Sequence, residues 1–557
     1  MKRLCIRNIK NIFIILALSL IASCGGGGGG GTSGPGATLV SISVAPLNQT
    51  IAKGALQQFI ATGTYSDSTT HDITSQLTWT SLSPGVATMS ATTFGLASGV
   101  AAGTATIKAA SGSIFGAATL TVVEPILVSI AVTPANAIVA KGLTRQFIAT
   151  GSYTPALTQD ITSQVTWSTT NSSIATMSTT TAGLASGVAT GSTTITATDP
   201  STSVQGSTTL SVMLLLGGSV QGNTLNLANT VSTFAGSAGV NGHTDGTGTA
   251  ARFYLPTGIT TDGRNLYVTD TSNHTIRKVE IATGAVTTLA GLAPFSGSTN
   301  GTGTTARFNS PYGITTDGTN LYVADTYNHI IRKVVIATGE VTTFAGMKGT
   351  SGSVDGTGTA AAFYYPYGIT TDGTNLYVAD TYNHTIRQVV IATGAVTTLA
   401  GTAGIYGTLD RTGPAAQFDG PAGITTDGTN LYVADTNNHA IRKVVIATGA
   451  VTTLAGLTGP ANLGSTDGTG TTARFHLPYG ITTDGTNLYV ADTYNNTIRK
   501  VEIATGVVTT PVGAAGTCGS TDGTGAAAQF CHPDGATTDG TNLYVTDEYN
   551  HTIRKIQ

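Results

Sequence analysis

The sequence has little charge, few cysteines and almost no tryptophan. Only 10% of its 557 residues are Asp, Glu, Lys or Arg, against roughly 25% in an average soluble domain. The formal net charge is −3, so no strong field draws the chain to nucleic acid, and we expect no nucleic-acid partner. Helix-favouring runs of Glu, Lys, Leu and Gln are scarce as well. Glycine, threonine and alanine take their place, a composition typical of strands and tight turns, and we expect an all-β fold.

The N-terminal segment has a basic start and an apolar stretch, Ile12–Ile21, that is short for a bilayer span. It ends Ala22-Ser23-Cys24, which resembles the lipobox of bacterial lipoproteins. The resemblance implies that residues 1–23 are a signal peptide and that Cys24 is lipidated. We then expect a lipid anchor to the bacterial cell envelope, at the outer membrane, periplasmic or surface-exposed. An ordinary signal peptide with an incidental cysteine remains the alternative.

A glycine-rich tether, residues 24–37, is expected to be a flexible coil. Two copies of one sequence follow it, offset by 88 residues, so that Leu39-Val-Ser-Ile recurs at Leu127 and Thr-Trp79 recurs at Trp167. Short alternating strands in modules of this length predict β-sandwiches. The two tryptophans are expected to anchor the two cores on central strands.

The motif order in each copy is Thr-Trp, Ala-Thr-Met, Gly-Leu-Ala-Ser-Gly. This order resembles the bacterial Ig-like group 2 family over residues 38–124 and 125–213. The resemblance implies spacer or adhesin segments in a surface protein. Residues 214–230 are interpreted as a linker.

The rest of the chain repeats one phrase, Asp325-Thr-Tyr-Asn-His-Ile-Ile-Arg332, with small changes. The six copies are 55, 55, 55, 57 and 55 residues apart. A fixed period of this size predicts a repeat architecture.

One unit shows which strands each repeat forms. Strands are predicted at Gly313–Thr316, Leu321–Asp325, Ile331–Ile336 and Val341–Gly346, and Asp317-Gly318 marks a hairpin turn. Four antiparallel strands that are apolar on both faces are typical of a propeller blade.

The Asn-His loop and the surrounding Leu-Tyr-Val-Ala-Asp and Ile-Arg-Lys resemble the NHL repeat family over residues 231–557. The resemblance implies a β-propeller. The last unit stops at Gln557 without its fourth strand, and an orphan copy of that strand, Val231–Ala235, precedes the first unit. We therefore expect two Ig-like β-sandwiches in tandem followed by a six-bladed β-propeller, closed by this N-terminal strand.

An aspartate and an arginine seven residues later recur in every unit, which favours a structural brace over a single asymmetric site. These residues are Asp270, Arg277, Asp325, Arg332, Asp380, Arg387, Asp435, Arg442, Asp492, Arg499, Asp547 and Arg554. A histidine occupies the following loop in five units, and Asn496 replaces it in the sixth. Because asparagine can make the same hydrogen bond but is a poor zinc ligand, we expect loop bracing and no metal site.

No cofactor is expected, although calcium at the Asp-Gly-Thr-Gly loops is a minor alternative. Cys518 and Cys531 lie in the last linking loop, and we expect a disulfide between them in an oxidising compartment.

The linking loops differ from one another, and binding residues usually lie on such variable loops. The candidate ligand-binding residues are Tyr254, Phe295, Tyr364, Tyr365, Tyr406, Arg411, His476 and His532. A weakly charged, tyrosine-rich face suits a protein or glycan ligand. The leading hypothesis is a monomeric, envelope-anchored binding or scaffold protein without a catalytic cluster. The alternatives are a metal-dependent lyase or hydrolase on the propeller and a purely structural envelope component.

Overall fold

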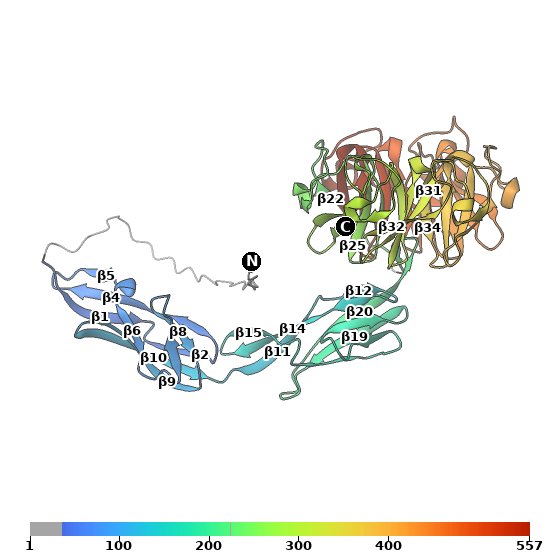
Figure 1. Cartoon of the computed structure of the whole chain (residues 1–557). Helices are drawn as coiled ribbons and strands as arrows, with labels where there is room; N and C mark the ends of the chain where they lie inside the picture. The colour runs from blue at the N-terminus through green and yellow to red at the C-terminus, as the bar shows by residue number, and fades with distance from the viewer. Residues whose placement is uncertain (1–35, 223) are drawn as a thin grey trace, which may run out of the picture. The chain divides into compact units, whose positions relative to one another are not determined.

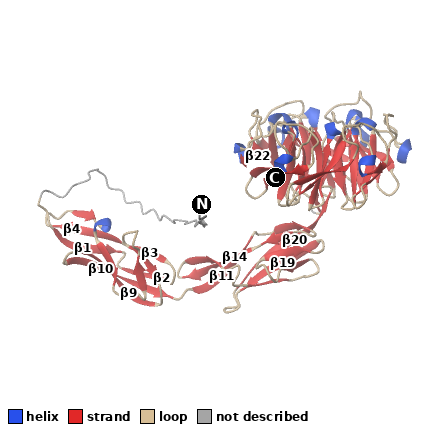
Figure 2. Cartoon of the chain, viewed as in Figure 1, coloured by secondary structure: helices blue, strands red, loops and turns tan. Residues whose placement is uncertain are grey.

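The computed structural model describes residues 36–222 and 224–557. The signal peptide, Cys24 and most of the tether lie outside the described residues. The described chain consists of strands and three-residue 3-10 turns (Figure 2). None of its helical turns is long and apolar enough to cross a membrane.

The first Ig-like module (blue in Figure 1) is built from three small sheets, with strand orders β1-β4-β5, β2-β10-β9-β6 and β3-β8-β7. Its strands are β1 (Leu39–Ala45), β2 (Asn48–Ala52), β3 (Leu56–Gln58), β4 (Ile60–Tyr65), β5 (Thr70–Asp72), β6 (Thr78–Ser81), β7 (Ala87–Met89), β8 (Leu96–Gly99), β9 (Gly103–Ser111) and β10 (Ile114–Val123), with the turn η1 (Thr74–Gln76). Its core contains Phe59, Ile107 and Leu120, each fully buried.

The second Ig-like module repeats this arrangement with orders β11-β14-β15, β12-β20-β19-β16 and β13-β18-β17. Its strands are β11 (Ile126–Thr133), β12 (Ala137–Ala140), β13 (Thr144–Gln146), β14 (Ile148–Thr154), β15 (Leu157–Asp160), β16 (Thr166–Thr169), β17 (Ala175–Met177), β18 (Leu184–Gly187), β19 (Gly191–Thr198) and β20 (Gln205–Leu216).

The tryptophans do not lie on central strands, so that expectation is wrong. Trp79 lies on β6 and Trp167 on β16, and both are edge strands of their sheets. Trp79 is half-buried against the core, and its indole N–H donates to the Thr74 carbonyl at 2.9 Å. An edge position suits an amphipathic ring that packs on one side and hydrogen-bonds at the other.

The C-terminal region forms six sheets, each a blade of the propeller (green to red in Figure 1). The inner strands are β24 (Pro256–Thr261), β29 (Pro311–Thr316), β34 (Pro366–Thr371), β38 (Pro421–Thr426), β43 (Ile481–Thr483) and β48 (Pro533–Thr538). The second strands are β25 (Asn265–Asp270), β30 (Asn320–Asp325), β35 (Asn375–Asp380), β39 (Asn430–Asp435), β44 (Asn487–Asp492) and β49 (Leu543–Asp547). The third strands are β26 (Thr275–Glu280), β31 (Ile330–Val335), β36 (Thr385–Val390), β40 (Ala440–Val445), β45 (Thr497–Glu502) and β50 (Thr552–Ile556).

The outer strands are β27 (Ala285–Ala290), β32 (Glu340–Ala345), β37 (Ala395–Ala400), β41 (Ala450–Ala455), β46 (Val507–Gly513) and, from before the first blade, β22 (Thr230–Gly236). β22 pairs antiparallel with β50, with Val231 opposite Ile556. Five blades add a two-residue strand that was not predicted: β23 (Gly246–Thr247), β28 (Gly301–Thr302), β33 (Gly356–Thr357), β42 (Gly468–Thr469) and β47 (Gly523–Thr524).

Two 3-10 turns accompany each blade, and in Figure 2 the turns gather toward one face of the propeller. Those after the second strands are η3 (Thr271–Asn273), η5 (Thr326–Asn328), η7 (Thr381–Asn383), η9 (Thr436–Asn438), η11 (Thr493–Asn495) and η13 (Glu548–Asn550). Those in the linking loops are η2 (Gly248–Ala250), η4 (Gly303–Thr305), η6 (Gly358–Ala360), η8 (Gly413–Ala415), η10 (Gly470–Thr472) and η12 (Gly525–Ala527).

The propeller core lies between blades rather than within them. Tyr322 and Ile331 of one blade pack on Phe363 and Leu376 of the next, and all four are buried. Each inner strand lies beside the next, and β48 lies beside β24, so the ring is continuous. A Cβ on Gly313 would clash with the carbonyl of Tyr367, so glycine is required where adjacent inner strands approach.

Candidate functional site

The recurrent aspartate and arginine form a buried ion pair in all six blades. In the third blade, Arg387 is fully buried and donates to Asp380 at 2.8 Å and to Asp355 at 2.7 Å. Its guanidinium lies 5.3 Å from the centre of the Phe363 ring. Burial raises the pKa of Asp380 to about 6 even though Arg387 and Asn383 oppose the shift. Because all six blades contain this ion pair, it does not mark any one blade as a ligand site.

The Asp-Gly-Thr-Gly aspartates take part in the same braces, and Asn300 substitutes for the aspartate in the second blade. Their carboxylates therefore have arginine partners. No cluster of three or more His, Cys, Asp or Glu side chains that could hold a metal is found over the described ranges.

The loop histidines join neighbouring blades. The backbone N–H of Tyr365 donates to His329 Nδ1 at 3.2 Å, and that of Leu477 donates to His439 Nδ1 at 3.1 Å. Asn496 Oδ1 accepts the equivalent N–H of His532 at 2.9 Å. Burial lowers the pKa of these histidines, which favours the neutral ring that can accept a hydrogen bond.

The residues predicted to bind ligand are spread around the rim and do not form one site. Tyr364 and Tyr365 form an aromatic cluster with Tyr382. The remaining rim residues lie elsewhere: Tyr254 against His551, Tyr406 against His384, His476 between His439 and Tyr494, and Phe295 and Arg411 exposed on their loops. Among the eight, only His532 lines the cavity at the propeller axis.

This cavity, here called the axial funnel, has an outer part of about 130 Å³ and an inner part of about 80 Å³. Both parts share Tyr312, Tyr367, Tyr479 and Asp534, which immediately precede the inner-strand glycines of their blades. The outer part also contains Thr493, Tyr494, His532, Glu548 and Tyr549.

Aromatic rings cover two sides of the axial funnel. The rings of Tyr312 and Tyr367 lie 4.4 Å apart, while His532 stacks on Tyr549 with centroids 4.2 Å apart. Burial raises the pKa of the Tyr312 and Tyr367 phenols well above the ordinary value, so both are neutral.

Asp534 and Glu548 are the two carboxyl groups of the axial funnel. Both are half-buried, and within the described part of the chain no hydrogen bond or ion pair engages either carboxyl group. Burial raises the pKa of both groups, and their mutual repulsion raises that of Glu548 further. In the sixth blade, two carboxyl groups that have no hydrogen-bond or ion-pair partner among the described residues thus line an aromatic cavity.

The floor of the axial funnel is a hairpin from the segment interpreted as a linker. β20 turns at Gly217-Gly218 into β21 (Ser219–Gln221), within the compact unit that holds the propeller. The Gly217 N–H donates to the Thr371 carbonyl at 2.8 Å, and the Thr260 and Thr537 hydroxyls both donate to the Gly218 carbonyl at 2.9 Å. A Cβ on Gly218 would clash with Thr260. The funnel therefore ends blindly at this hairpin.

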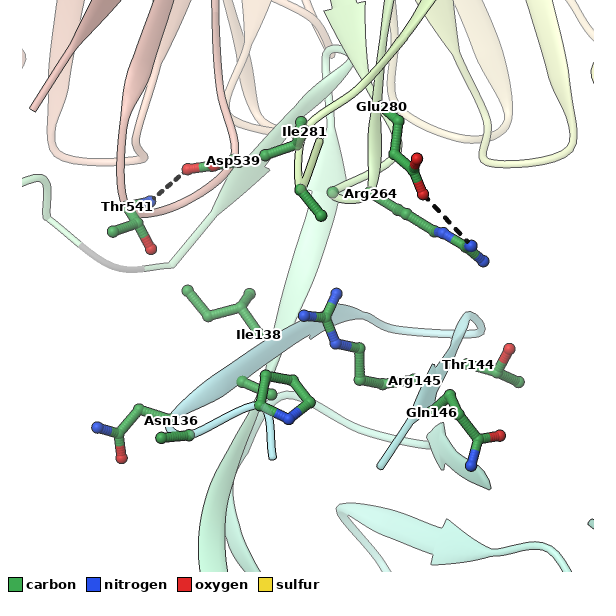
Figure 3. A pocket seen from close by; sticks show the side chains of 15 residues that line it. Asn136, Ile138, Thr144, Arg145, Gln146, Arg264, Glu280, Ile281, Asp539 and Thr541 are labelled. Atoms are coloured by element: carbon green, nitrogen blue, oxygen red, sulfur yellow. Dashed lines mark hydrogen bonds and ion pairs between the residues drawn. The ribbon is translucent and has the colours of Figure 1, made fainter. Parts of the chain in front are cut away.

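A second hollow, of about 420 Å³, is lined by side chains that include Arg145, Arg264 and Glu280 (Figure 3). The Arg264 guanidinium lies 3.8 Å from Glu280, which leaves Arg145 as the cation facing the hollow. The hollow contains no aromatic ring and no paired acids.

The sequence predictions missed Asp534 and Glu548, although aligning the six repeats exposes both. The residue after the inner-strand proline is Thr257, Tyr312, Tyr367, Ala422, Tyr479 and Asp534 in turn. The residue after the brace aspartate is threonine in five units and Glu548 in the sixth. In five of the six blades the residue before the inner-strand glycine lines the axial funnel, and these residues are Tyr312, Tyr367, Ala422, Tyr479 and Asp534.

The five threonines show what Glu548 replaces. Thr326, for example, donates to the carbonyl of Pro366 in the next blade at 2.7 Å, and its four counterparts do the same. Glu548 forgoes this bond between blades. Positions at which a local rule fails are commonly functional or strained, so Glu548 is a candidate functional residue.

Comparison with known proteins identifies the domains. The model of the bacterial Ig-like domain, group 2, matches residues 39–122 and 127–212, and the NHL repeat model matches residues 253–279. Human NHL repeat-containing protein 2 is 30% identical over 322 residues, covering 52% of this chain and 44% of that protein. Ice-binding protein 1 of Shewanella frigidimarina is 46% identical over 125 residues, covering 22% of this chain and 14% of that protein.

Among solved structures, an auxiliary nutrient binding protein from Bacteroides thetaiotaomicron has a TM-score of 0.45 at 15% identity, covering 77% of this chain and 98% of that one. The chain spans less than half the length of the curated relatives it matches. The chain thus contains two bacterial Ig-like group 2 domains and a β-propeller whose first blade matches the NHL repeat.

Proposed function

We propose that the chain is a cell-envelope-anchored binding protein in which the axial funnel receives a projecting group of a protein or glycan ligand. One observation carries the proposal: the funnel is a blind cavity whose lining differs from blade to blade, whereas the braces around it repeat. Aromatic rings with a few polar groups are typical of ligand pockets.

The sixth blade concentrates the departures from the repeat. Besides Asp534 and Glu548, it carries the disulfide between Cys518 and Cys531, and the Cys531 N–H donates to Asp547 at 2.8 Å. The disulfide fixes the loop that leads into His532 and Asp534. A binding group on a rigid support is a favourable arrangement for recognition.

The Ig-like domains are proposed to act as spacers between a lipid anchor at Cys24 and the propeller. Labelling with a radioactive fatty acid, compared between the parent and Cys24→Ala, tests the anchor. Label retained by Cys24→Ala would refute it.

Ligand recognition is tested with the full chain on arrays of glycans, peptidoglycan fragments and envelope proteins. Tyr479→Ala and Tyr312→Ala are compared with Tyr406→Ala, which removes an exposed rim tyrosine of another blade. We expect the funnel variants to lose binding by about tenfold or more, as for buried aromatic hot spots. Binding that survives both funnel variants but not Tyr406→Ala would move the site to the rim.

A further inference from the structure

We infer that the axial funnel selects an organic ammonium group, which enters between the tyrosine rings and pairs with the carboxyl groups of Asp534 and Glu548. This inference rests on the proposed function, since it names the chemistry of the group that the funnel receives.

The first step of the argument is charge. Asp534 and Glu548 line one cavity and form no ion pair with any described residue, whereas the aspartate that opens each of the six braces has a buried arginine. Two half-buried carboxyl groups that repel each other are unfavourable, and a ligand cation would offset both the repulsion and the burial cost. A neutral hydroxyl ligand would relieve neither.

The second step is the aromatic lining. Tyr312 and Tyr367 form one wall, and His532 with Tyr549 forms another, with Tyr494 4.6 Å from His532. Ring faces attract a cation in a desolvated site, and aromatic enclosures of this kind recognise ammonium groups. Burial lowers the pKa of His532, so this ring remains neutral and does not repel the ligand.

The third step separates an organic cation from a metal ion. Calcium takes about six to eight oxygen ligands, whereas the axial funnel offers two carboxyl groups and is otherwise lined mainly by rings. Its outer part of about 130 Å³ has room for several heavy atoms. An alkylammonium or aminosugar group satisfies both the charge and the rings.

The test uses pairs of probes that differ in the charge of one nitrogen. The full chain is titrated calorimetrically with Nα-acetyl-lysine methylamide and with its Nε-acetylated form, and separately with glucosamine and N-acetylglucosamine. We expect the charged member of at least one pair to bind and its acetylated partner to bind about tenfold more weakly or not at all. The lysine and glucosamine pairs distinguish a protein source of the ammonium group from a glycan source.

The matched variants are Asp534→Asn with Glu548→Gln, and Glu340→Gln as a control that removes one negative charge from the exposed first residue of β32. The double variant should lose about tenfold or more in affinity for the charged probe, while the control should bind like the parent. Circular dichroism of the tyrosines checks whether each variant retains the propeller.

Three outcomes overturn the inference. Equal binding of charged and acetylated probes would remove the selection for a cation while leaving the funnel as a binding site. Failure of all four probes, together with array binding that depends on Tyr479, would leave the proposed function intact without an ammonium ligand. Calcium chloride that binds alone and is lost in the double variant would make the carboxyl pair a metal site instead.

Discussion

His329 Nδ1 accepts the backbone N–H of Tyr365 at 3.2 Å, and this bond joins the second blade to the third. Asn496 makes the same connection to His532 at 2.9 Å with an amide oxygen. Six side chains therefore accept a hydrogen bond between neighbouring blades. The five histidines lose the accepting lone pair when they are protonated, whereas the Asn496 amide oxygen does not.

These histidine acceptors predict that the stability of the propeller decreases in acid. Because burial lowers the folded-state pKa of the histidines, the unfolded chain binds protons first as the pH falls below about 6.5. Stability should therefore fall through that range and continue to fall until the folded-state pKa is passed. His329→Asn should reduce the acid sensitivity, whereas His329→Ala should cost roughly 0.5–1.5 kcal/mol at neutral pH.

Urea unfolding followed by tyrosine circular dichroism at about pH 5 and about pH 7.5 measures this effect. Trp79 and Trp167 are the only tryptophans and lie outside the propeller, so their fluorescence reports the Ig-like domains separately. If His329→Asn and His329→Ala behave alike at both pH values, the acceptor role is wrong.

Removing one partner of a buried aspartate–arginine brace is expected to lower the free energy of unfolding strongly. Arg387→Met leaves Asp380 and Asp355 without their guanidinium and should destabilise the propeller by about 3–5 kcal/mol. Arg264→Met is the control, since that side chain is 74% exposed and should change stability by less than about 0.5 kcal/mol. Equal effects of the two variants on the tyrosine-monitored transition would contradict the brace.

Because β22 completes the sixth blade, we expect the stability of the whole propeller to depend on Val231. Val231 is 1% exposed and packs with Ile556 and Ala528. Val231→Asp should cost about 3 kcal/mol or more, because it buries an unpaired charge in the sixth blade. Val240→Asp, at a position that is 48% exposed, is the control. A tyrosine transition unmoved by Val231→Asp would show that β22 adds little to the closed ring.

The raised pKa of Asp534 predicts that the propeller loses stability as the pH rises, the opposite of the histidine effect. The folded-state pKa of Asp534 is raised, so between its unfolded value of about 4 and its folded value the folded chain retains a proton that the unfolded chain has lost. Stability therefore falls as the pH rises through this window. Asp534→Asn should make the propeller more stable than the parent by about 1–2 kcal/mol at pH ~9 and change it little at pH ~4.

The same unfolding measurement checks this, with Glu340→Gln as a charge control. A stability difference between Asp534→Asn and the parent that does not vary with pH would show that Asp534 has an ordinary pKa.

The periodicity of the sequence predicted the blades closely because strands and turns are local features. The strand predicted at Leu321–Asp325 is observed at Asn320–Asp325, and that predicted at Ile331–Ile336 at Ile330–Val335. The pairing of Asp325 with Arg332 was also predictable, since antiparallel neighbours seven residues apart share one hairpin. A phrase repeated six times shows which side chains the blade needs.

The axial funnel depends instead on residues that no local pattern brings together. Tyr312, Tyr367 and Tyr479 are far apart in sequence and meet Asp534 only when the inner strands close into a ring. Likewise, Gly217-Gly218 reads as part of a linker, and its role as the funnel floor depends on bonds to Thr371 and Thr260. The sequence by itself determined the strands, the braces and the Ig-like modules, because each follows from neighbouring residues. Only the closed ring decided which side chains face one cavity, since its axis is made by the convergence of six separate blades.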